Sequence, residues 1–184
     1  YESMNMAALW KLPAVFCCIN NQYGMGTKVD RAVGLKDFSG RAKSFGLNTI
    51  HITTLDVEEA YFKAKPIIED ARNGKPGFIE IECYRFYGHA RMDKSLYRQE
   101  KEEKKGRKED PITFAKNKLI NNKLLTKQQI HQLDSVISNE MDKAMNFAIK
   151  SPLNSNREIF KDVYDNNKPL PTSIKVRINK ILNS

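Results

Sequence analysis

A continuous apolar run at residues 14–19 constrains the fold of this chain more than any other feature. The run favours a β-strand and has no polar position that could face water, which is typical of a strand covered on both faces in a parallel sheet. Two further strands are predicted at residues 48–53 and 78–84, with helical segments between them. The sequence therefore predicts an α/β fold with a mostly parallel sheet flanked by helices.

Two short helices are predicted on either side of the first strand. Residues 4–12 favour helix and are apolar on nearly every side, and Pro13 ends this segment. A helix that is apolar all round must be buried. Residues 37–45 form the second helix, and Gly46 suits the left-handed conformation that ends it.

A longer helix is predicted from Asp56 to residue 72. Asp56 with Glu59 three positions on is typical of a capping box at a helix start, and Asn73-Gly74 ends the segment. Pro66 lies inside it, where a proline removes a hydrogen bond and clashes with the preceding turn. We therefore expect a kink or a break at this proline.

Helices are also predicted to follow the last strand. Asp110-Pro111 and Thr126 with Gln129 are helix-start signals, and Pro152 ends the regular pattern. The second of these helices has one apolar face at helical spacing, so its methionines are expected to face the core. This face consists of Ile130, Leu133, Val136, Ile137, Met141, Ala144, Met145 and Ala148.

The charge of the chain bears on its partners. The 184 residues carry a formal net charge of +9, from 31 lysines and arginines against 22 acidic residues, and such an excess could mark a nucleic-acid surface. The basic residues are interleaved with acidic ones, however, and no aromatic platform or nucleic-acid motif accompanies them. We therefore expect no nucleic-acid partner, and a basic binding module is the alternative.

The longest apolar run, residues 12–19, is far shorter than the ~20 residues of a membrane-spanning helix, so no membrane partner is expected.

The three cysteines, Cys17, Cys18 and Cys83, bear on the compartment. Their number is odd, and their spacing does not suggest a zinc site. We expect buried free thiols in a reducing compartment. A bacterial cytoplasm fits this expectation, and a mitochondrion or a plastid-like organelle fits it as well.

The first predicted strand leads into a polar loop with two glycines at residues 20–27. In open α/β sheets, ligands bind at the carboxyl ends of the strands. An asparagine side-chain oxygen and nearby backbone carbonyls are hard neutral ligands that suit Mg²⁺ or Ca²⁺, especially beside a phosphate group. Gly24 and Gly26 let the backbone approach a ligand closely. The alternative is an asparagine-rich turn whose side chains satisfy backbone groups.

A second loop, residues 85–93, follows the last predicted strand and contains His89. A loop histidine can exchange protons near neutral pH, so His89 is a candidate acid–base residue. The alternative is an exposed histidine without a role. His51 and His131 occupy predicted strand and helix positions and are interpreted as structural.

The order of several short motifs resembles one family. The sequence Met-Ala-Ala-Leu-Trp-Lys-Leu-Pro precedes Ile-Asn-Asn-Gln-Tyr-Gly-Met-Gly-Thr, and there follow Tyr-Arg-Phe-Tyr-Gly-His, Tyr-Arg at residues 97–98 and Asp-Pro-Ile from residue 110. This ordered set is similar to the alpha subunits of thiamine-diphosphate-dependent 2-oxo acid dehydrogenases, in particular those of the pyruvate and acetoin type. The resemblance covers about residues 1–165.

The resemblance implies a thiamine-diphosphate-binding fold and the decarboxylating first component of a pyruvate or acetoin dehydrogenase complex, with acyl transfer to lipoamide. In that family the second asparagine of the Asn-Asn pair and a carbonyl two residues later bind Mg²⁺, which bridges the cofactor's diphosphate. Those positions are Asn21 and Tyr23 here. The family's loop histidine matches His89, which is implied to lie near the cofactor and to assist proton movements. The implied partners are a beta subunit in an α2β2 heterotetramer, a lipoyl-bearing acyltransferase, and a 2-oxo acid or acetoin as substrate.

One departure from the family pattern concerns the Gly-Asp-Gly motif, which precedes the Asn-Asn pair by roughly thirty residues in the family and is absent here. We therefore expect the sequence to be the C-terminal portion of a longer subunit, inactive alone because it lacks the charged metal ligand. Residues 1–109 would be the C-terminal portion of the cofactor-binding α/β domain, residues 110–165 a helical C-terminal region of the same domain, and residues 166–184 a basic tail.

Two further departures concern regulation. Ala90 and Lys28 occupy positions at which mitochondrial members of the family have serines, one of which a kinase phosphorylates to inactivate the enzyme. Control by phosphorylation is not expected at these two positions, because neither side chain accepts phosphate in that chemistry. An alpha-like structural or regulatory subunit that has the fold without the activity is the alternative to the enzyme.

Overall fold

The computed structural model describes residues 1–156, 158 and 161. The chain divides into two compact units, Tyr1–Lys127 and Gln128–Ser184. The predicted basic tail, residues 166–184, lies outside the described residues. The helices and strands are, in chain order, α1 (Glu2–Leu9), β1 (Val15–Asn20), β2 (Tyr23–Gly24), β3 (Thr27–Lys28), α2 (Val29–Ala32), α3 (Phe38–Lys43), β4 (Asn48–Ile52), α4 (Val57–Arg72), β5 (Gly77–Glu82), α5 (Glu100–Lys108), α6 (Pro111–Asn121) and α7 (Lys127–Lys150).

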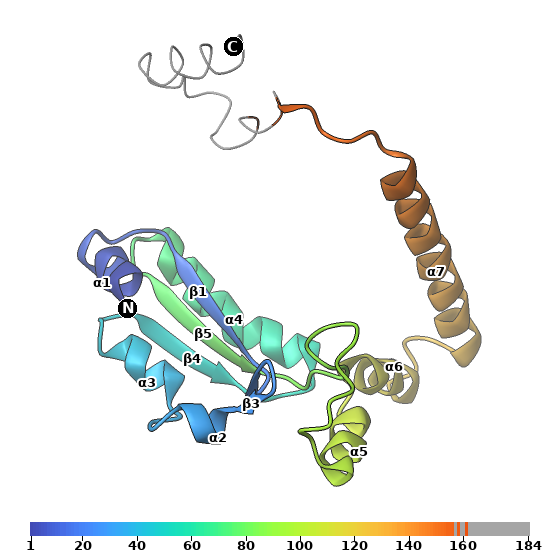
Figure 1. The fold of residues 1–184 in the computed structure, drawn as a ribbon, viewed down its shortest axis with the longest axis horizontal. Helices are drawn as coiled ribbons and strands as arrows, with labels where there is room; N and C mark the ends of the chain where they lie inside the picture. The colour runs from blue at the N-terminus through green and yellow to red at the C-terminus, as the bar shows by residue number, and fades with distance from the viewer. Residues whose placement is uncertain (157, 159–160, 162–184) are drawn as a thin grey trace. The chain divides into compact units, whose positions relative to one another are not determined.

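Three parallel strands form the central sheet in the order β1-β5-β4 (Figure 1). Asn20 on β1 is in register with Glu82 on β5, and His51 on β4 is in register with Glu80 on β5. A short antiparallel hairpin, β2-β3, follows β1. The α/β class with a parallel sheet and flanking helices, which the sequence predicts, is confirmed.

Different helices cover the two faces of the sheet. On one face, Phe78 of β5 packs with Ala42 of α3 and with Leu47, and α1 lies against this cluster. On the other face α4 lies so close to the strands that a Cβ added to Gly77 of β5 would be 2.3 Å from Ile67 Cγ2. Since the strands are parallel, the loops that follow β1 and β5 begin at the same edge of the sheet.

β1 lies at the edge of the sheet and is less covered than its sequence predicts. Ile19 is 67% exposed, Cys17 and Cys83 are exposed, Cys18 is half-buried, and all three cysteines are free thiols. The predictions of a strand covered on both faces and of buried cysteines are therefore wrong. Exposed and half-buried residues alternate along β1, because α4 packs mainly against β4 and β5 and the described helices leave one face of β1 uncovered.

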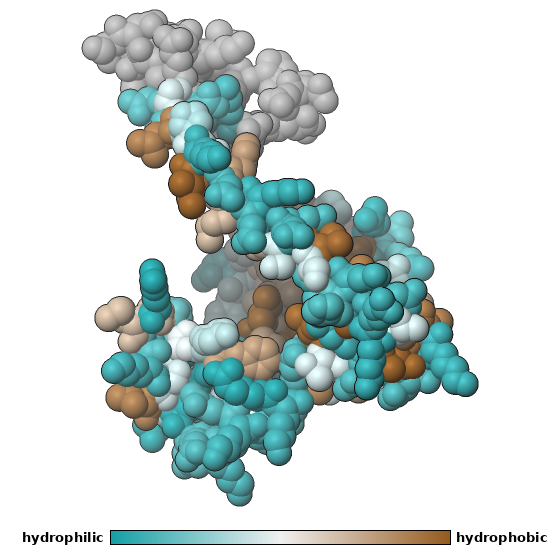
Figure 2. Space-filling view, turned by 90° about the vertical axis from the view of Figure 1, so that its right-hand side faces the viewer, coloured by the Kyte–Doolittle hydropathy of each residue, from teal (hydrophilic) through white to brown (hydrophobic). Residues whose placement is uncertain are grey.

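α1 is likewise buried on one side only. Ala7 is the one buried residue of this helix, whereas Leu9 is 70% and Trp10 58% exposed. The prediction of a helix buried all round is wrong, because unit 1 covers α1 only on the side that faces the sheet. Figure 2 shows that apolar side chains, in brown, are exposed at several places among hydrophilic ones in teal.

Hydrogen bonds explain where the helices begin. Asp37, Asp56 and Asp110 accept backbone N–H groups at the starts of α3, α4 and α6, as expected of capping residues. Glu59, however, accepts from the Thr54 hydroxyl at 2.7 Å. It does not close the predicted capping box, because the Asp56 N–H already donates to Thr54 Oγ1 at 3.1 Å.

α4 continues through Pro66 as one helix, so the predicted break does not occur. Pro66 is exposed, and water can therefore serve the carbonyl that loses its helical partner. The predicted glycine ends are confirmed. Gly46 after α3 and Gly74 after α4 have φ angles of +86° and +77°, which favour glycine.

α7 begins directly after Thr126 and ends before Pro152, as the sequence predicts. None of its residues is buried, and Met141 and Met145 are each 64% exposed. The prediction that these methionines face a core is wrong, because the described part of unit 2 contains no second long helix or strand to cover α7. In the part of the chain that the structure describes, no helix is both long and apolar enough to cross a membrane.

Candidate functional site

Two asparagines hold the loop that follows β1. Asn20 Oδ1 accepts from the Gln22 backbone N–H at 3.2 Å and from Gln22 Nε2 at 3.0 Å. Asn21 Oδ1 accepts from the Tyr23 N–H at 3.0 Å. These bonds stabilise a tight turn in which Gln22 has a φ of +66°. An amide oxygen has two lone pairs, so Asn21 Oδ1 keeps the capacity to bind a cation as well.

A buried carboxylate fixes this turn from the neighbouring strand. Glu80 of β5 is 2% exposed, and its Oε1 accepts from Asn20 Nδ2 at 2.8 Å. Its Oε2 accepts from the backbone N–H and the hydroxyl of Ser39 in α3, at 3.3 Å and 3.2 Å. A buried charge requires such partners, so Glu80 connects the sheet, α3 and the loop. Sequence reasoning missed this residue, although a glutamate between Ile79 and Ile81 is a detectable signal.

Open space borders the turn. A cavity of about 510 Å³ is lined by Asn20, Asn21 and Tyr23 together with residues of β1, α2 and α3. A cavity of about 240 Å³ is lined by Asn21 and Tyr23 together with Tyr84 and residues of α5. A larger cavity of about 800 Å³, lined by Lys28 and side chains around α5, includes none of the predicted site residues. Asn21 and Tyr23 are thus accessible from two sides.

Arg85 joins this loop to the loop that follows β5. Its Nη2 donates to the Met25 carbonyl at 2.8 Å and to the Tyr97 hydroxyl oxygen at 2.9 Å. Its Nη1 lies 3.5 Å from His89 Nδ1. A guanidinium can only donate, so His89 accepts this weak bond only in the tautomer that has its proton on Nε2. Arg85 thereby links His89 to the Met25 end of the asparagine loop, although His89 lines neither of the two cavities at Asn21 and Tyr23.

Asp93 fixes the backbone at His89. Its Oδ2 accepts from the His89 N–H at 2.7 Å and from the Tyr97 hydroxyl at 2.8 Å, and its Oδ1 accepts from the Ser95 N–H at 2.8 Å. These bonds, above all the one from His89, lower the pKa of the Asp93 carboxyl to about 2. Asp93 is therefore ionised at neutral pH. The side chain of His89 is exposed, so its ring can meet a ligand while its main chain is held.

Arg98 packs against the tyrosines of both loops. It is 7% exposed, and its Cζ lies 5.1 Å from the ring centroids of Tyr23 and Tyr84 and 5.8 Å from that of Tyr97. Cation–π contacts of this kind stabilise the arrangement of the rings. Burial, together with a hydrogen bond to Glu102, raises the pKa of Tyr23 to about 12, so this phenol stays neutral.

The two glycines of the first loop serve different purposes. A Cβ at Gly26 would lie 3.1 Å from the ring of Tyr97, whereas no atom of the described residues lies within 4 Å of a Cβ at Gly24. Gly26 therefore permits the close packing of the two loops. The backbone at Gly24 borders the 510 Å³ cavity and is open to a ligand.

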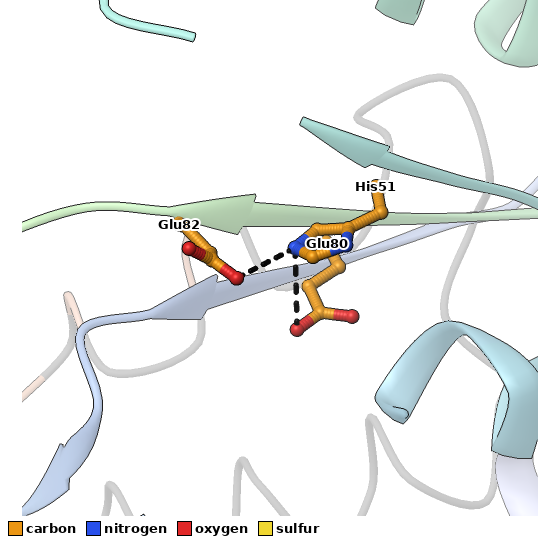
Figure 3. Close-up of side chains that lie close together, drawn as sticks. All are labelled: His51, Glu80 and Glu82. Carbon is orange, nitrogen blue, oxygen red and sulfur yellow. Dashed lines mark hydrogen bonds and ion pairs between the residues drawn. The ribbon is translucent and has the colours of Figure 1, made fainter. Parts of the chain in front are cut away.

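The two remaining histidines have different surroundings. His51 lies beside the carboxylates of Glu80 and Glu82, as Figure 3 shows. The sequence interprets His51 as structural and does not indicate that these two carboxylates lie beside it. His131 is exposed on α7, and its carbonyl accepts from the Ser135 hydroxyl at 3.0 Å.

Comparisons with known proteins identify the family. The model of the family described as "Dehydrogenase E1 component" matches residues 1–156. The chain is 33% identical to the pyruvate dehydrogenase E1 component subunit alpha of Rickettsia felis over 165 residues. These residues make up 89% of this chain and 51% of that protein. It is 37% identical to the subunit alpha of Rhizobium meliloti, over 89% of this chain and 47% of that protein. It is 36% identical to the somatic, mitochondrial subunit alpha of Bos taurus, over 92% of this chain and 44% of that protein.

The chain spans about half the length of these curated relatives. The family model matches most of the chain, and the matched residues include both loops of the site. The resemblance that the motifs indicate is confirmed, and the chain belongs to the dehydrogenase E1 component family.

Proposed function

We propose that this chain is part of the alpha subunit of the first, decarboxylating component of a 2-oxo acid dehydrogenase complex. The proposed substrate is pyruvate or acetoin, and the proposed cofactors are thiamine diphosphate and Mg²⁺. The family and the pyruvate dehydrogenase alpha subunits among the relatives support this proposal. The observation that carries it is the contact of Arg85 with both Met25 and His89, because it joins the loop of the proposed metal ligands to the loop of the proposed proton-transfer residue.

Asn21 and Tyr23 are the residues that would hold Mg²⁺, through the Asn21 side-chain oxygen and the Tyr23 carbonyl. Their fit rests on donor chemistry, since both are hard neutral oxygens on a turn that borders a cavity of about 510 Å³. The negative charge would come from the diphosphate and from the aspartate of the family's Gly-Asp-Gly motif, which is absent from this sequence. We therefore propose that residues 1–184 alone are inactive.

His89 is proposed to hold or move a proton at Nε2 beside the cofactor. Thiamine diphosphate, when bound, supplies the carbanion-stabilising chemistry that amino-acid side chains lack. In the tautomer that has its proton on Nε2, Nδ1 can accept from Arg85, and Asp93 fixes the main chain of the histidine. The exposed ring would then present Nε2 as the donor for the proton movements that accompany acyl transfer to lipoamide.

The proposed assembly pairs the alpha subunit with a beta subunit as an α2β2 heterotetramer. The acyl group would pass to a lipoyl-bearing acyltransferase. The relatives are named as subunit alpha of a component, and this supports a second kind of subunit. A bacterial cytoplasm is the proposed compartment, and the mitochondrial designation of the Bos taurus relative makes a mitochondrion the second candidate.

The test uses the complete subunit co-expressed with its beta subunit. We expect turnover of pyruvate or acetoin that depends on thiamine diphosphate and Mg²⁺. Asn21→Ala is expected to raise the Mg²⁺ concentration for half-maximal activity by about tenfold or more. His89→Ala is expected to lower kcat by about 10²-fold or more without changing the Mg²⁺ requirement. His131→Ala, at an exposed position of α7, is the control and is expected to leave both quantities unchanged.

The same experiment separates the enzyme from an alpha-like structural subunit. The bond between Asn21 Oδ1 and the Tyr23 N–H favours this second candidate, because it gives the asparagine a role without a metal. An assembly that forms with the beta subunit and turns over neither pyruvate nor acetoin, nor a closely related substrate, would contradict the enzyme and support the structural role.

A further inference from the structure

His51, Glu80 and Glu82 converge at the carboxyl edge of the sheet (Figure 3). His51 on β4 is in register with Glu80 on β5, and Glu82 follows two residues later, so all three side chains share one face. His51 Nε2 lies 2.9 Å from Glu82 Oε1 and 3.9 Å from Glu80 Oε1. One potential ligand atom from each residue lies within 4.8 Å of the other two.

We propose that these three residues bind a divalent transition-metal ion of the Zn²⁺ type. One imidazole nitrogen and two carboxylate oxygens form a ligand set that such ions accept, at about 2.0–2.2 Å from the metal. Ligand atoms around one tetrahedral ion of this size are roughly 3.4 Å apart. The two separations from His51 Nε2, 2.9 Å and 3.9 Å, lie on either side of this value, so small side-chain rotations suffice to bind an ion.

The charges of the cluster support a shared cation. Glu80 and Glu82 are carboxylates on one face of one strand, and an oxygen of each approaches the same imidazole nitrogen. His51 Nε2 has at most one proton to donate, and it is close enough to hydrogen-bond only to Glu82. A dication among the three groups neutralises both carboxylates at once.

The bonds that Glu80 already makes orient it as a ligand. Asn20 donates to its Oε1, and Ser39 donates twice to its Oε2. A carboxylate has about four acceptor positions, so Oε1 keeps one for a metal ion. Hydrogen bonds of this kind hold a ligating carboxylate in place and strengthen metal binding. The ion would thus meet one fixed ligand at the base of the site.

The other two ligands are accessible from solvent. The side chains of His51 and Glu82 are 42% and 44% exposed, so an ion can enter and keep water as a further ligand. An imidazole ligand favours Zn²⁺ or Co²⁺, whereas Mg²⁺ prefers oxygen ligands. The site is therefore chemically different from the one proposed at Asn21 and Tyr23, and it does not depend on the proposed function.

Titrations of the complete subunit with Co²⁺ and Zn²⁺ test the site. All samples contain excess Mg²⁺, which occupies sites that are built from oxygen alone. Co²⁺ absorption and calorimetry with Zn²⁺ are expected to show that the wild type binds each ion. The affinity for both ions is expected to fall at least about tenfold in His51→Ala and in Glu82→Gln. Both side chains are substantially exposed, so these variants are expected to fold, and circular dichroism checks this.

Two control variants complete the experiment. His131→Ala removes an exposed histidine outside the cluster, and Asn21→Ala removes a ligand of the proposed Mg²⁺ site. Both are expected to keep the wild-type affinity for Co²⁺ and Zn²⁺. Because Asn21→Ala acts on the Mg²⁺ dependence of turnover alone, failure of the proposed function and failure of this site can be told apart.

Two results would overturn the site. The first is an equal affinity of the wild type, His51→Ala and Glu82→Gln for both ions. The second is a Co²⁺ spectrum dominated by thiolate charge transfer that persists in both variants, because the ion would then be bound by cysteines.

Discussion

β1 and β5 are neighbouring parallel strands, and β1 is the more apolar of the two but the less buried. β1 is apolar from Val15 to Ile19, yet its residues alternate between exposed and half-buried up to Asn20. β5 contains two glutamates, and its first four residues, up to Glu80, are all buried. β5 is the central strand and β1 an edge strand. The comparison teaches that burial in this sheet depends on which strands the helices cover, and α4 packs mainly against β4 and β5. Hydropathy decides which residues need hydrogen-bond partners once they are buried.

The partners of Glu80 show how β5 accepts a buried charge. Three hydrogen bonds from Asn20 and Ser39 replace the water that the carboxylate loses. The same bonds hold the turn that leads to Asn21. Glu80 is therefore both a buried charge that β5 must have hydrogen-bonded and the side chain that holds the turn of the candidate site.

The largest expected effect comes from paired truncations on the two strands. Ile79 of β5 is 5% exposed and Ile19 of β1 is 67% exposed. Ile79→Ala should lower the free energy of unfolding by about 3 kcal/mol, because it leaves a cavity between the sheet and α4. Ile19→Ala should lower it by less than about 0.5 kcal/mol. Urea unfolding measures both, and equal losses would show that β1 is covered as well as β5.

A smaller effect is expected from removing the buried charge. Glu80→Gln keeps the size of the side chain but turns one acceptor into a donor that faces Asn20 or Ser39, which should cost about 2 kcal/mol. Glu82→Gln, at an exposed position two residues later, should change stability by less than about 0.5 kcal/mol. Urea unfolding in the presence of a chelator compares the two without a contribution from bound ions. A neutral Glu80→Gln would contradict the role assigned to this carboxylate.

Local signals in the sequence predict the helices and strands, but they do not predict which distant residues form hydrogen bonds with one another. The Asp110 cap and the glycine after α4 depend on residues a few positions away, so pattern alone locates them. The bonds from Asn20 to Glu80 and from Arg85 to Met25 each join residues 60 positions apart. No local pattern indicates which distant strand or loop will supply a partner, and the supports of the site were therefore missed.

The errors about burial have a related cause. The apolar patterns of β1, α1 and α7 indicate which side chains could be buried. They do not indicate which other part of the protein covers those side chains. Met141 on α7 and Ile19 on β1 are apolar and exposed for this reason. The loop at the carboxyl end of β1 was located correctly, because that position follows from the order of the elements alone.

The two adjacent cysteines of β1 can distinguish its two faces. Burial, together with the charge of Glu80, raises the pKa of the Cys18 thiol. Cys17 points to the opposite face and is exposed. Since the thiolate is the reactive form, Cys17 should react several-fold faster than Cys18 with a thiol reagent at pH 8. Variants that keep one of these cysteines and replace the others by serine measure each rate, and a faster Cys18 would contradict the assignment of the faces.

The smallest expected effect concerns the exposed loop after β5, where a charge is held without burial. The folded-state pKa of Asp93 is about 2, below its ordinary value of 3.8, so the ionised form favours the folded loop. The contribution of Asp93 should be complete above pH 4 and be lost as the pH falls through about 2. The carboxyl carbon of Asp93 and the amide of His89 should therefore titrate together by NMR, and Asp93→Asn should abolish this transition at the His89 amide. A midpoint near 3.8 would mean that the bonds to the His89 and Ser95 amides do not hold this loop in solution.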